Sequence, residues 1–418
     1  QLGLPGGGYN YALGTLAHYG KRNNLVSAAA LNQGTNGVKD FIPVARITDM
    51  LLHPGQPFDY NGQRRSYPHI RLAYWAGGNP FHHHQDLARL AEGFRRLETF
   101  VVHESAWTAT ARFADIVLPA TLSVEREDIG GTPTDPVLVA MHRIAPPIGQ
   151  ARDDYDIFSE LARRLGRLEA FSEGRDTRQW LAYLYGRTRS GLAELGHEMP
   201  DFETFWAQGE FQLPQGPDDG GMLRAFREAP EAHPLPTPSG KFQVSSQAVA
   251  SFGYADCPGH PAWLPPEEVP DDKHPLHLVA NQPATRLHSQ LDFGAWSQAA
   301  TRQGRDDCTL HPRTAAARGI AEGDIVRLFN DRGACLASAT LSAQMRPDVV
   351  QLPTGAWYDP VEMPDGTMLC VHGNPNVLTR DVGTSSLAQG CSGQLTVVQV
   401  ERFEGELPPI RAYDPPAA

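Results

Sequence analysis

Apolar residues in the first part of the chain occur either in short runs or at helical spacing. Three runs, at residues 70–75, 99–103 and 116–118, have the length and composition of buried strands. Residues 86–94 and 155–165 instead place apolar side chains three and four positions apart, as one face of a helix does. Strands that alternate with helices over residues 41–169 predict an α/β fold with a parallel, doubly wound sheet.

The pattern changes after residue 170 and again after residue 275. Residues 170–270 are rich in aromatic residues, Pro and Gly, and a helix at 177–184 is followed by long loops. Residues 265–275 combine Pro with charged side chains, which is typical of a linker between domains. Residues 276–403 are predicted to be mainly β and to close into a compact C-terminal β-barrel. Its predicted elements are strands at 276–280, 325–330, 335–340, 349–352 and 395–400, a short helix at 315–319, and a hairpin turn at 330–333.

Composition excludes several classes of protein. A chain of 418 residues is too long for one core, so two or three domains are expected. No run of about 18 apolar residues occurs, which predicts no membrane span. A net charge of −12 without Lys/Arg clusters argues against nucleic acid as a partner. The five cysteines lack any Cys-x-x-Cys spacing, so we expect free thiols and neither a zinc ribbon nor an iron–sulfur cluster.

Residues 74–86 carry the most informative local pattern. The predicted strand is followed by Gly77 and Gly78, by Asn79 and Pro80, and by a helix expected from about residue 85. Glycines let a backbone approach a ligand closely, and a helix N-terminus favours an anion, so the pattern predicts phosphate binding. An ordinary turn before a helix is the alternative. The three consecutive histidines at 82–84 are not expected to ligate a metal, because neighbouring side chains cannot all face one ion.

Two other segments concentrate polar groups at the ends of predicted strands. His103 and Glu104 follow a buried strand, where a carboxylate can accept from ribose hydroxyls or from a guanine edge. Residues 281–290 gather amide, guanidinium, imidazole and hydroxyl groups, which suit a ligand of fused rings and phosphates. The alternatives are a solvated strand end and a solvated loop. The sequence contains neither the Gly-x-Ser-x-Gly motif of many hydrolases nor the Walker loop of nucleoside triphosphatases.

Five segments, in order along the chain, together resemble the molybdopterin oxidoreductases of the dimethyl sulfoxide reductase family. Within that family, the chain resembles the branch of the biotin sulfoxide, dimethyl sulfoxide and trimethylamine N-oxide reductases. The segments are Tyr-Trp-Ala-Gly-Gly-Asn-Pro-Phe-His-His-His-Gln-Asp (74–86), residues 103–121, residues 252–264, Arg-Leu-His-Ser-Gln-Leu (286–291) and His-Gly-Asn-Pro-Asn-Val-Leu-Thr (372–379).

The resemblance implies that the enzyme binds molybdenum as bis(molybdopterin guanine dinucleotide). The cofactor-binding residues that it implies are Gly7, Gly8, Gly78, Asn79, His83, His103, Glu104, Arg126, Asp154, Ala280, Asn281, Gln282, Pro283, Arg286, His288, Ser289, Gln290, Asn376, Gly393 and Gln394. Residues 130–135 depart from the family's pattern, so Asp153 and Asp156 stay open as alternatives to Asp154.

The family places a Leu-Pro-Gly-Gly-Gly motif, here residues 4–8, near the middle of its chains. The resemblance therefore implies that this chain is the C-terminal half of an enzyme. It divides the chain into the tail of a preceding cofactor-binding domain (1–40), an α/β dinucleotide-binding domain (41–270, helical and loop-rich from about 170) and the barrel (276–405). The metal's Ser ligand and the aromatic residues near the metal would lie in the other half. No catalytic residue and no metal ligand is expected here, and the isolated chain is expected to be inactive.

The implied reaction is removal of an oxygen atom from an S-oxide or N-oxide, as in bacterial anaerobic respiration. Residues 256–261 and 390–393 favour the biotin/methionine sulfoxide branch, which is cytoplasmic, whereas most N-oxide reductases are periplasmic. The electron donor, a protein or a nicotinamide cofactor, stays open. Two alternatives remain. One is a non-catalytic module that binds the nucleotide or a separate catalytic subunit. The other is a nicotinamide dehydrogenase, weakened because the turn is Gly-Gly-Asn-Pro rather than Gly-x-Gly-x-x-Gly.

Overall fold

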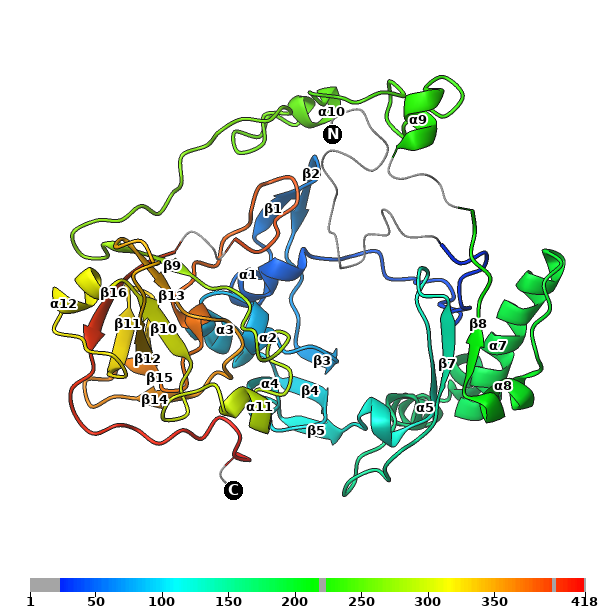
Figure 1. The fold of residues 1–418 in the computed structure, drawn as a ribbon, viewed down its shortest axis with the longest axis horizontal. Helices are drawn as coiled ribbons and strands as arrows, with labels where there is room; N and C mark the ends of the chain where they lie inside the picture. Colours follow the sequence, from blue (N-terminus) through cyan, green and yellow to red (C-terminus); the bar gives the residue numbers. More distant parts are fainter. Residues whose placement is uncertain (1–22, 218–222, 393–395, 417–418) are drawn as a thin grey trace. The chain divides into compact units, whose positions relative to one another are not determined.

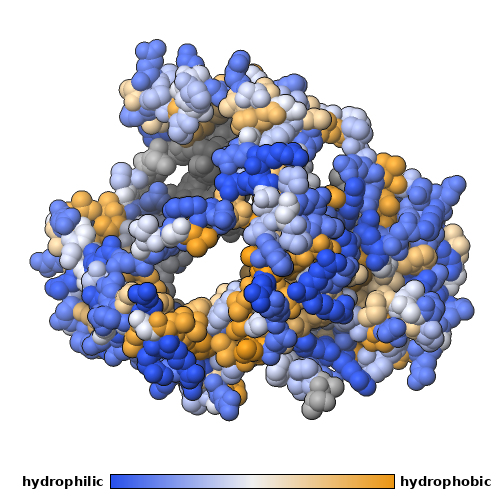
Figure 2. Space-filling view, turned by 180° about the vertical axis from the view of Figure 1, so that it is seen from behind, coloured by the Kyte–Doolittle hydropathy of each residue, from blue (hydrophilic) through white to orange (hydrophobic). Residues whose placement is uncertain are grey.

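The computed structural model describes residues 23–217, 223–392 and 396–416, and these form two compact units. One unit contains residues 23–39 and 119–244, and the other contains residues 40–118 together with the C-terminal part of the chain from residue 245 (Figure 1). Each unit is thus built from two stretches of sequence. Figure 2 shows polar and charged side chains over most of the visible face, with apolar patches between them. Within the described residues, no helix combines the length and apolarity needed to span a bilayer.

A three-stranded sheet lies in the unit of residues 40–118 and 245–416. Its strands β3 (Leu72–Ala76), β4 (Thr99–Glu104) and β5 (Ile116–Pro119) lie in the order β3-β4-β5. β3 and β4 are parallel, and their register runs from Leu72 opposite Thr99 to Ala76 opposite His103. The predicted parallel sheet is confirmed. The other elements of this stretch are η1 (Val44–Arg46), α1 (Ile47–Leu52), β1 (Pro57–Tyr60), β2 (Gln63–Ser66), α2 (Pro80–His83), α3 (Leu87–Phe94) and α4 (Ala109–Arg112).

The predicted C-terminal barrel is also confirmed. Six strands lie in the order β10-β13-β9-β16-β11-β12, and the parallel pairing of β10 with β12 closes the ring (Figure 1). The hairpin predicted at 330–333 joins β11 to β12 in antiparallel register. The elements of this part are α10 (Gln247–Ser251), β9 (Leu276–Val279), α11 (Ala295–Gln298), β10 (Asp307–Leu310), α12 (Pro312–Ala316), β11 (Ile325–Phe329), β12 (Ala334–Leu341), β13 (Val349–Gln351), β14 (Pro360–Glu362), β15 (Met368–Cys370), η3 (Pro375–Val377) and β16 (Thr396–Arg402).

One hydrophobic core joins the parallel sheet to the barrel within this unit. Phe81 of α2 stacks on Phe113 at 4.3 Å between ring centroids and on Tyr358 at 5.8 Å. Leu90 of α3 and Leu328 of the barrel belong to the same buried cluster. Because aromatic pairs and close packing resist displacement, this core fixes the loop after β3 against the loops of the barrel.

The other unit has its own core. Strands β6 (Asp128–Gly130), β7 (Val137–Met141) and β8 (Glu210–Gln212) form an antiparallel sheet, and Leu138, Tyr185 and Phe205 are buried together. The helix predicted at 177–184 continues to Glu194. The prediction ended too early because the buried face of the helix passes through Thr188, whose polar side chain interrupts the apolar pattern. The remaining elements are η2 (Ser123–Glu125), α5 (Asp154–Arg164), α6 (Leu168–Ser172), α7 (Thr177–Glu194), α8 (Phe202–Gln208) and α9 (Arg224–Glu228).

Candidate functional site

The turn after β3 has the expected glycine conformation but a different helix after it. Gly77 and Gly78 have φ of +81° and +89°, which other residues rarely adopt. The next helix is the four-residue α2, and α3 begins only at Leu87. The helix expected from about residue 85 is therefore α3, and α2 was not predicted. Asp86 caps α3 by accepting from the Arg89 amide, so the protein's own carboxylate occupies that helix N-terminus, and an anion would not bind there.

The loop that contains η3 binds the backbone around α2. The Asn374 side chain donates to the carbonyl of Phe81 at 2.9 Å, and the Asn376 side chain donates to the carbonyl of His82. The amide of Asp86 donates to the carbonyl of Thr379 at 3.1 Å. Each asparagine is buried. Two segments nearly 300 residues apart are thus held in one place, which the sequence order alone does not reveal.

A cavity of about 380 Å³ lies between these loops and the barrel. Six of its lining residues are among those predicted to bind the cofactor, and they come from three separate stretches of sequence. Its lining is His82, His83, Gln85, Ala280, Asn281, Gln282, His288, Thr354, Asn376, Thr379 and Cys391, of which His83, Ala280, Asn281, Gln282, His288 and Asn376 were predicted.

Two buried polar atoms of the cavity lining have no hydrogen-bond partner among the described residues. They are Nδ1 of His82 and Oε1 of Gln85, and both side chains are about 5% exposed. A buried polar atom without a partner is costly, so a ligand able to donate and accept hydrogen bonds fits this lining. The sequence analysis did not select His82 and Gln85 as cofactor-binding residues. Their position close to His83 was the signal that could have indicated them.

His82 in the cavity wall and the neighbouring His84 are electrically neutral near pH 7. Burial lowers the pKa of His82 to about 3, and His83, His288 and Arg286 lower it further. Burial likewise lowers the pKa of the neighbouring His84 to about 3. Neutral imidazoles offer one donor and one acceptor each, which suits a heterocyclic ligand better than a bare anion. Within the described residues, no three His, Cys, Asp or Glu side chains are placed to hold a metal ion.

The two lowered pKa values predict a pH dependence of stability. In the unfolded chain these histidines bind protons near pH 6.5, whereas in the folded chain they do so only near pH 3. Between these two pH values the unfolded state therefore binds more protons than the folded state. As a result, the free energy of unfolding falls as the pH is lowered below 6.5. The fall is up to about 1.4 kcal/mol per pH unit for each histidine. Denaturation curves from pH 7 to pH 5 should show a smaller fall for His82→Gln than for the wild type. The exposed His53→Gln should match the wild type, and equal slopes for all three would contradict the prediction.

Several predicted residues in and beside the cavity also bond within the protein. Asn79 accepts from the Thr110 hydroxyl at 2.6 Å and lies 3.4 Å from the hydroxyl of Ser289, so it links the glycine turn to the barrel loop. The Gln282 side chain lies 2.9 Å from Nδ1 of His288 and accepts from the His288 amide at 3.1 Å. These contacts bring four predicted residues together. Pro283 is half-buried and Gln290 is exposed, and neither lines the cavity.

The polar pair at the end of β4 is already hydrogen-bonded. His103 is buried, and its Nε2 lies 2.6 Å from the Tyr74 hydroxyl. Glu104 accepts from the Ser105 amide at 2.9 Å and from the Thr108 hydroxyl at 3.0 Å. Burial raises the pKa of Glu104 above its usual value. Their contact with a guanosine stays a prediction.

Arg286 bonds inward instead of lining the cavity. Its guanidinium binds Asp306 at 2.5 Å, lies 3.4 Å from Asp292 and donates to the Ser297 hydroxyl at 3.0 Å. The side chain is about 1% exposed. In this structure Arg286 therefore stabilises the loop that carries His288, and its predicted direct contact with the cofactor remains untested.

Arg126 and Asp154 lie in the other unit, on the wall of a separate cavity of about 360 Å³. Trp180 and Tyr185 contribute to its apolar lining, and Asp153 also lines it, whereas Asp156 does not. The two predicted residues thus share a cavity, and of the two alternatives to Asp154 only Asp153 is present there. Four further predicted residues, Gly7, Gly8, Gly393 and Gln394, lie outside the described residues.

Comparison with known proteins agrees with this architecture. The chain matches the family models for molybdopterin oxidoreductase over residues 6–164 and for the molydopterin dinucleotide binding domain over residues 276–397. It is 48% identical to the biotin sulfoxide reductase of Cereibacter sphaeroides, over 99% of this chain and 56% of that protein. It is 42% identical to the dimethyl sulfoxide/trimethylamine N-oxide reductase of Rhodobacter capsulatus, over 100% of this chain and 53% of that protein.

A trimethylamine-N-oxide reductase of Haemophilus influenzae is 41% identical over 100% of this chain and 53% of its own length. The chain therefore spans about half the length of the curated relatives it matches. In structure it is similar to acetylene hydratase from Pelobacter acetylenicus, with a TM-score of 0.63 and 20% identity, over 86% of this chain and 46% of that one, which shows a shared fold. From its two matched domains and its relatives, the chain belongs to the molybdopterin oxidoreductases of the dimethyl sulfoxide reductase family.

Proposed function

We propose that this chain supplies part of the site for a bis(molybdopterin guanine dinucleotide) molybdenum cofactor in an enzyme that removes oxygen from an S-oxide or N-oxide. The observation that carries the proposal is the cavity beside α2, where His82 and Gln85 keep buried atoms without partners. Both matched domains belong to molybdopterin proteins, and relatives carry the names of S-oxide and N-oxide reductases. When bound, the cofactor would supply the two-electron chemistry at its metal.

The residues of this chain would bind and orient one dinucleotide. His82, His83 and His288 present imidazole rings, and Gln85 and Asn376 present amides, around a cavity whose walls come from the segment after β3 and from loops of the barrel. The amide groups offer donors and acceptors to fused rings, and the burial of the lining strengthens each such hydrogen bond. The cavity that contains Arg126 would accept part of the second dinucleotide, since a guanidinium binds two phosphate oxygens at once.

An S-oxide is the proposed substrate, and the cytoplasm is the proposed compartment. Identity is 48% to the biotin sulfoxide reductase and 42% to the dimethyl sulfoxide/trimethylamine N-oxide reductase, both named for an S-oxide, against 41% to the trimethylamine-N-oxide reductase. Oxygen removal is proposed only for the chain extended to the full length of its relatives, because this chain spans about half of that length. The chain by itself is proposed to be inactive.

Gln85→Leu tests the proposed cofactor site with two effects of opposite sign. Leu has nearly the volume of Gln and removes the buried oxygen that lacks a partner, so the cofactor-free chain should gain stability, by about 1 kcal/mol. In the full-length enzyme, the same change should lower the content of molybdenum and of GMP released by acid. Gln208→Leu, at an exposed position of α8, serves as the control.

A higher melting temperature together with a lower GMP content supports the site. An unchanged GMP content in Gln85→Leu would contradict it. The rival function, a non-catalytic module that binds the nucleotide, predicts GMP without molybdenum or oxygen removal in the full-length protein.

A further inference from the structure

The C-terminal segment of the chain returns across the barrel and is held there by buried groups. The Arg305 guanidinium donates to the carbonyls of Val371 and Pro408, each at 2.9 Å. The amide of Arg411 donates to Asp359 at 2.6 Å. Ala412 is fully buried. A segment held by a buried guanidinium and by a buried carboxylate is a fixed part of this unit.

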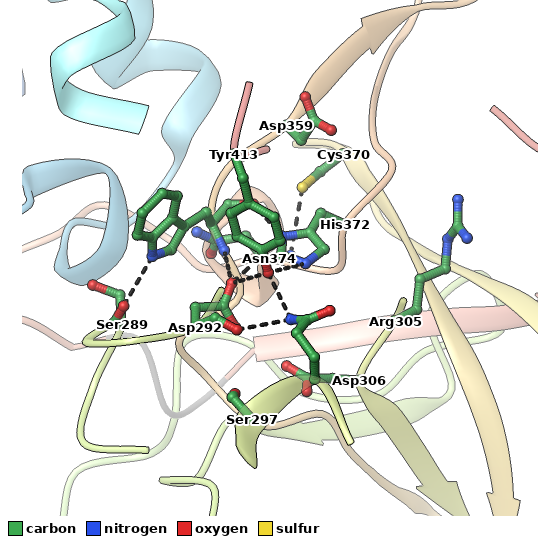
Figure 3. Close-up of polar contacts among 12 residues, drawn as sticks. Ser289, Asp292, Ser297, Arg305, Asp306, Asp359, Cys370, His372, Asn374 and Tyr413 are labelled. Carbon is green, nitrogen blue, oxygen red and sulfur yellow. Dashed lines mark hydrogen bonds and ion pairs between the residues drawn. The ribbon is translucent and has the colours of Figure 1, made fainter. Parts of the chain in front are cut away.

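This segment places the hydroxyl of Tyr413 in a polar cluster beside the loop of residues 286–292 (Figure 3). The hydroxyl lies 3.0 Å from Oδ2 of Asp292 and 3.0 Å from Nε2 of His372, and it accepts from the Gln298 amide at 2.8 Å. The tyrosine ring packs edge-on against Trp357, with 5.2 Å between ring centroids. A change of Tyr413 to Phe would therefore remove the hydrogen bonds and keep the packing of the ring against Trp357.

The direction of the hydrogen bonds follows from the donors available. Burial and the nearby Asp292 raise the pKa of Tyr413, so its hydroxyl keeps its proton. The Gln298 amide nitrogen can only donate, and the Tyr413 hydroxyl donates to the Asp292 carboxylate. The direction of the contact with Nε2 of His372 depends on the tautomer of that ring. Asp292 also accepts from the amide of Trp357 at 3.1 Å, and the Trp357 indole donates to the carbonyl of Ser289 at 2.8 Å. A continuous set of bonds thus connects Tyr413 to the loop.

The loop itself needs such support. His288 and Leu291 have φ of +53° and +54°, left-handed conformations that cost free energy in residues other than glycine. Leu287 and Leu291 are more than 60% exposed, so nothing described packs against the outer side of the loop. Its conformation therefore depends on the inner contacts with Arg286, Asp292 and Trp357.

We propose that Tyr413 is a positioning residue, which holds residues 288–290 through Asp292 and Trp357 in the conformation that binds the dinucleotide. The proposal rests on the function proposed above for the same loop. It assigns a role in cofactor retention to a side chain that does not line the cofactor cavity.

Tyr413→Phe in the full-length enzyme tests this role, with Tyr254→Phe as the matched control. Each change removes one hydroxyl and keeps the ring, and Tyr254 accepts from the Gly62 amide at 2.9 Å, away from the loop. Hydrogen exchange of the peptide 286–292 should become faster in Tyr413→Phe, on the order of tenfold, because a hydrogen bond to a charged group is lost. The GMP retained after dialysis should fall in parallel. Exchange in strands β9 and β16 should not change.

A double-mutant cycle with Asp292→Asn separates positioning from general packing. If Tyr413 acts through Asp292, the effects of the two changes on exchange of 286–292 are not additive. Additive effects, unchanged exchange in Tyr413→Phe, or faster exchange with unchanged GMP would each overturn the proposal. Absence of GMP from the wild-type enzyme would overturn the proposed function instead, and the exchange data would still decide whether Tyr413 holds the loop.

Discussion

Gly355→Ala is expected to displace the loop of residues 286–292 and to abolish cofactor retention. A Cβ atom at residue 355 would lie 2.2 Å from the carbonyl oxygen of His288 and 2.6 Å from Nε of Arg286. The backbone oxygen cannot move without the loop, and the guanidinium is fixed by its buried ion pairs. Gly355 also has a φ of +111°, where any other residue is strained by about 1–3 kcal/mol.

Gly366→Ala provides the control for that strain. Gly366 has a φ of +79°, and a Cβ there would meet nothing within 4 Å. This variant should lose stability from strain alone, by about 1–2 kcal/mol, and should keep its GMP. Gly355→Ala should lose more in denaturation experiments and should lose GMP as well. Equal losses in the two variants would show that the close approach to His288 has no effect.

Arg286→Met is expected to cost about 3–5 kcal/mol of unfolding free energy at neutral pH. The substitution leaves two buried carboxylates, Asp292 and Asp306, without the charge that now lies between them. Their charged forms would then repel each other at low polarity, so protonation relieves the loss. The deficit relative to the wild type should therefore shrink as the pH is lowered from 7 toward 5.

Arg71→Met is the matched control for Arg286→Met. Arg71 forms a two-point ion pair with Glu98, at 2.5 and 2.6 Å, but both side chains are more than half exposed. Water replaces such a pair, so little change in stability is expected. Two results would contradict the proposed role of the buried ion pairs of Arg286. One is a loss of unfolding free energy in Arg286→Met no larger than that in Arg71→Met. The other is a loss in Arg286→Met that grows as the pH is lowered.

The sequence predicted the elements whose signal is local. Strands β3, β4 and β5 and the hairpin of β11 and β12 lie within a few residues of their predicted positions, because apolar runs and turn residues specify them directly. Strand β10 was missed, since only Cys308 and Leu310 of its four residues are buried and the run is too short to show a period. Helix α2 was also missed, because its four residues are too few to show a helical period.

The candidate site was predictable by residue type but not by role. Asn376 and His288 were expected near a ligand, and both line the cavity. Arg286 was expected to contact the cofactor, and the fold brings Asp292 and Asp306 to its guanidinium, an ion-paired role that the sequence did not indicate. Asn374 was not singled out as a contact, although it fixes α2 by bonding the carbonyl of Phe81. Such roles follow from long-range contacts, which a single sequence does not show.

The most direct test of the central claim is the molybdenum and GMP content of the full-length enzyme, measured beside that of the 418-residue chain. The account predicts molybdenum with about two GMP per metal in the full-length enzyme, and little of either in the chain alone. A full-length enzyme that contains neither molybdenum nor GMP would contradict the account.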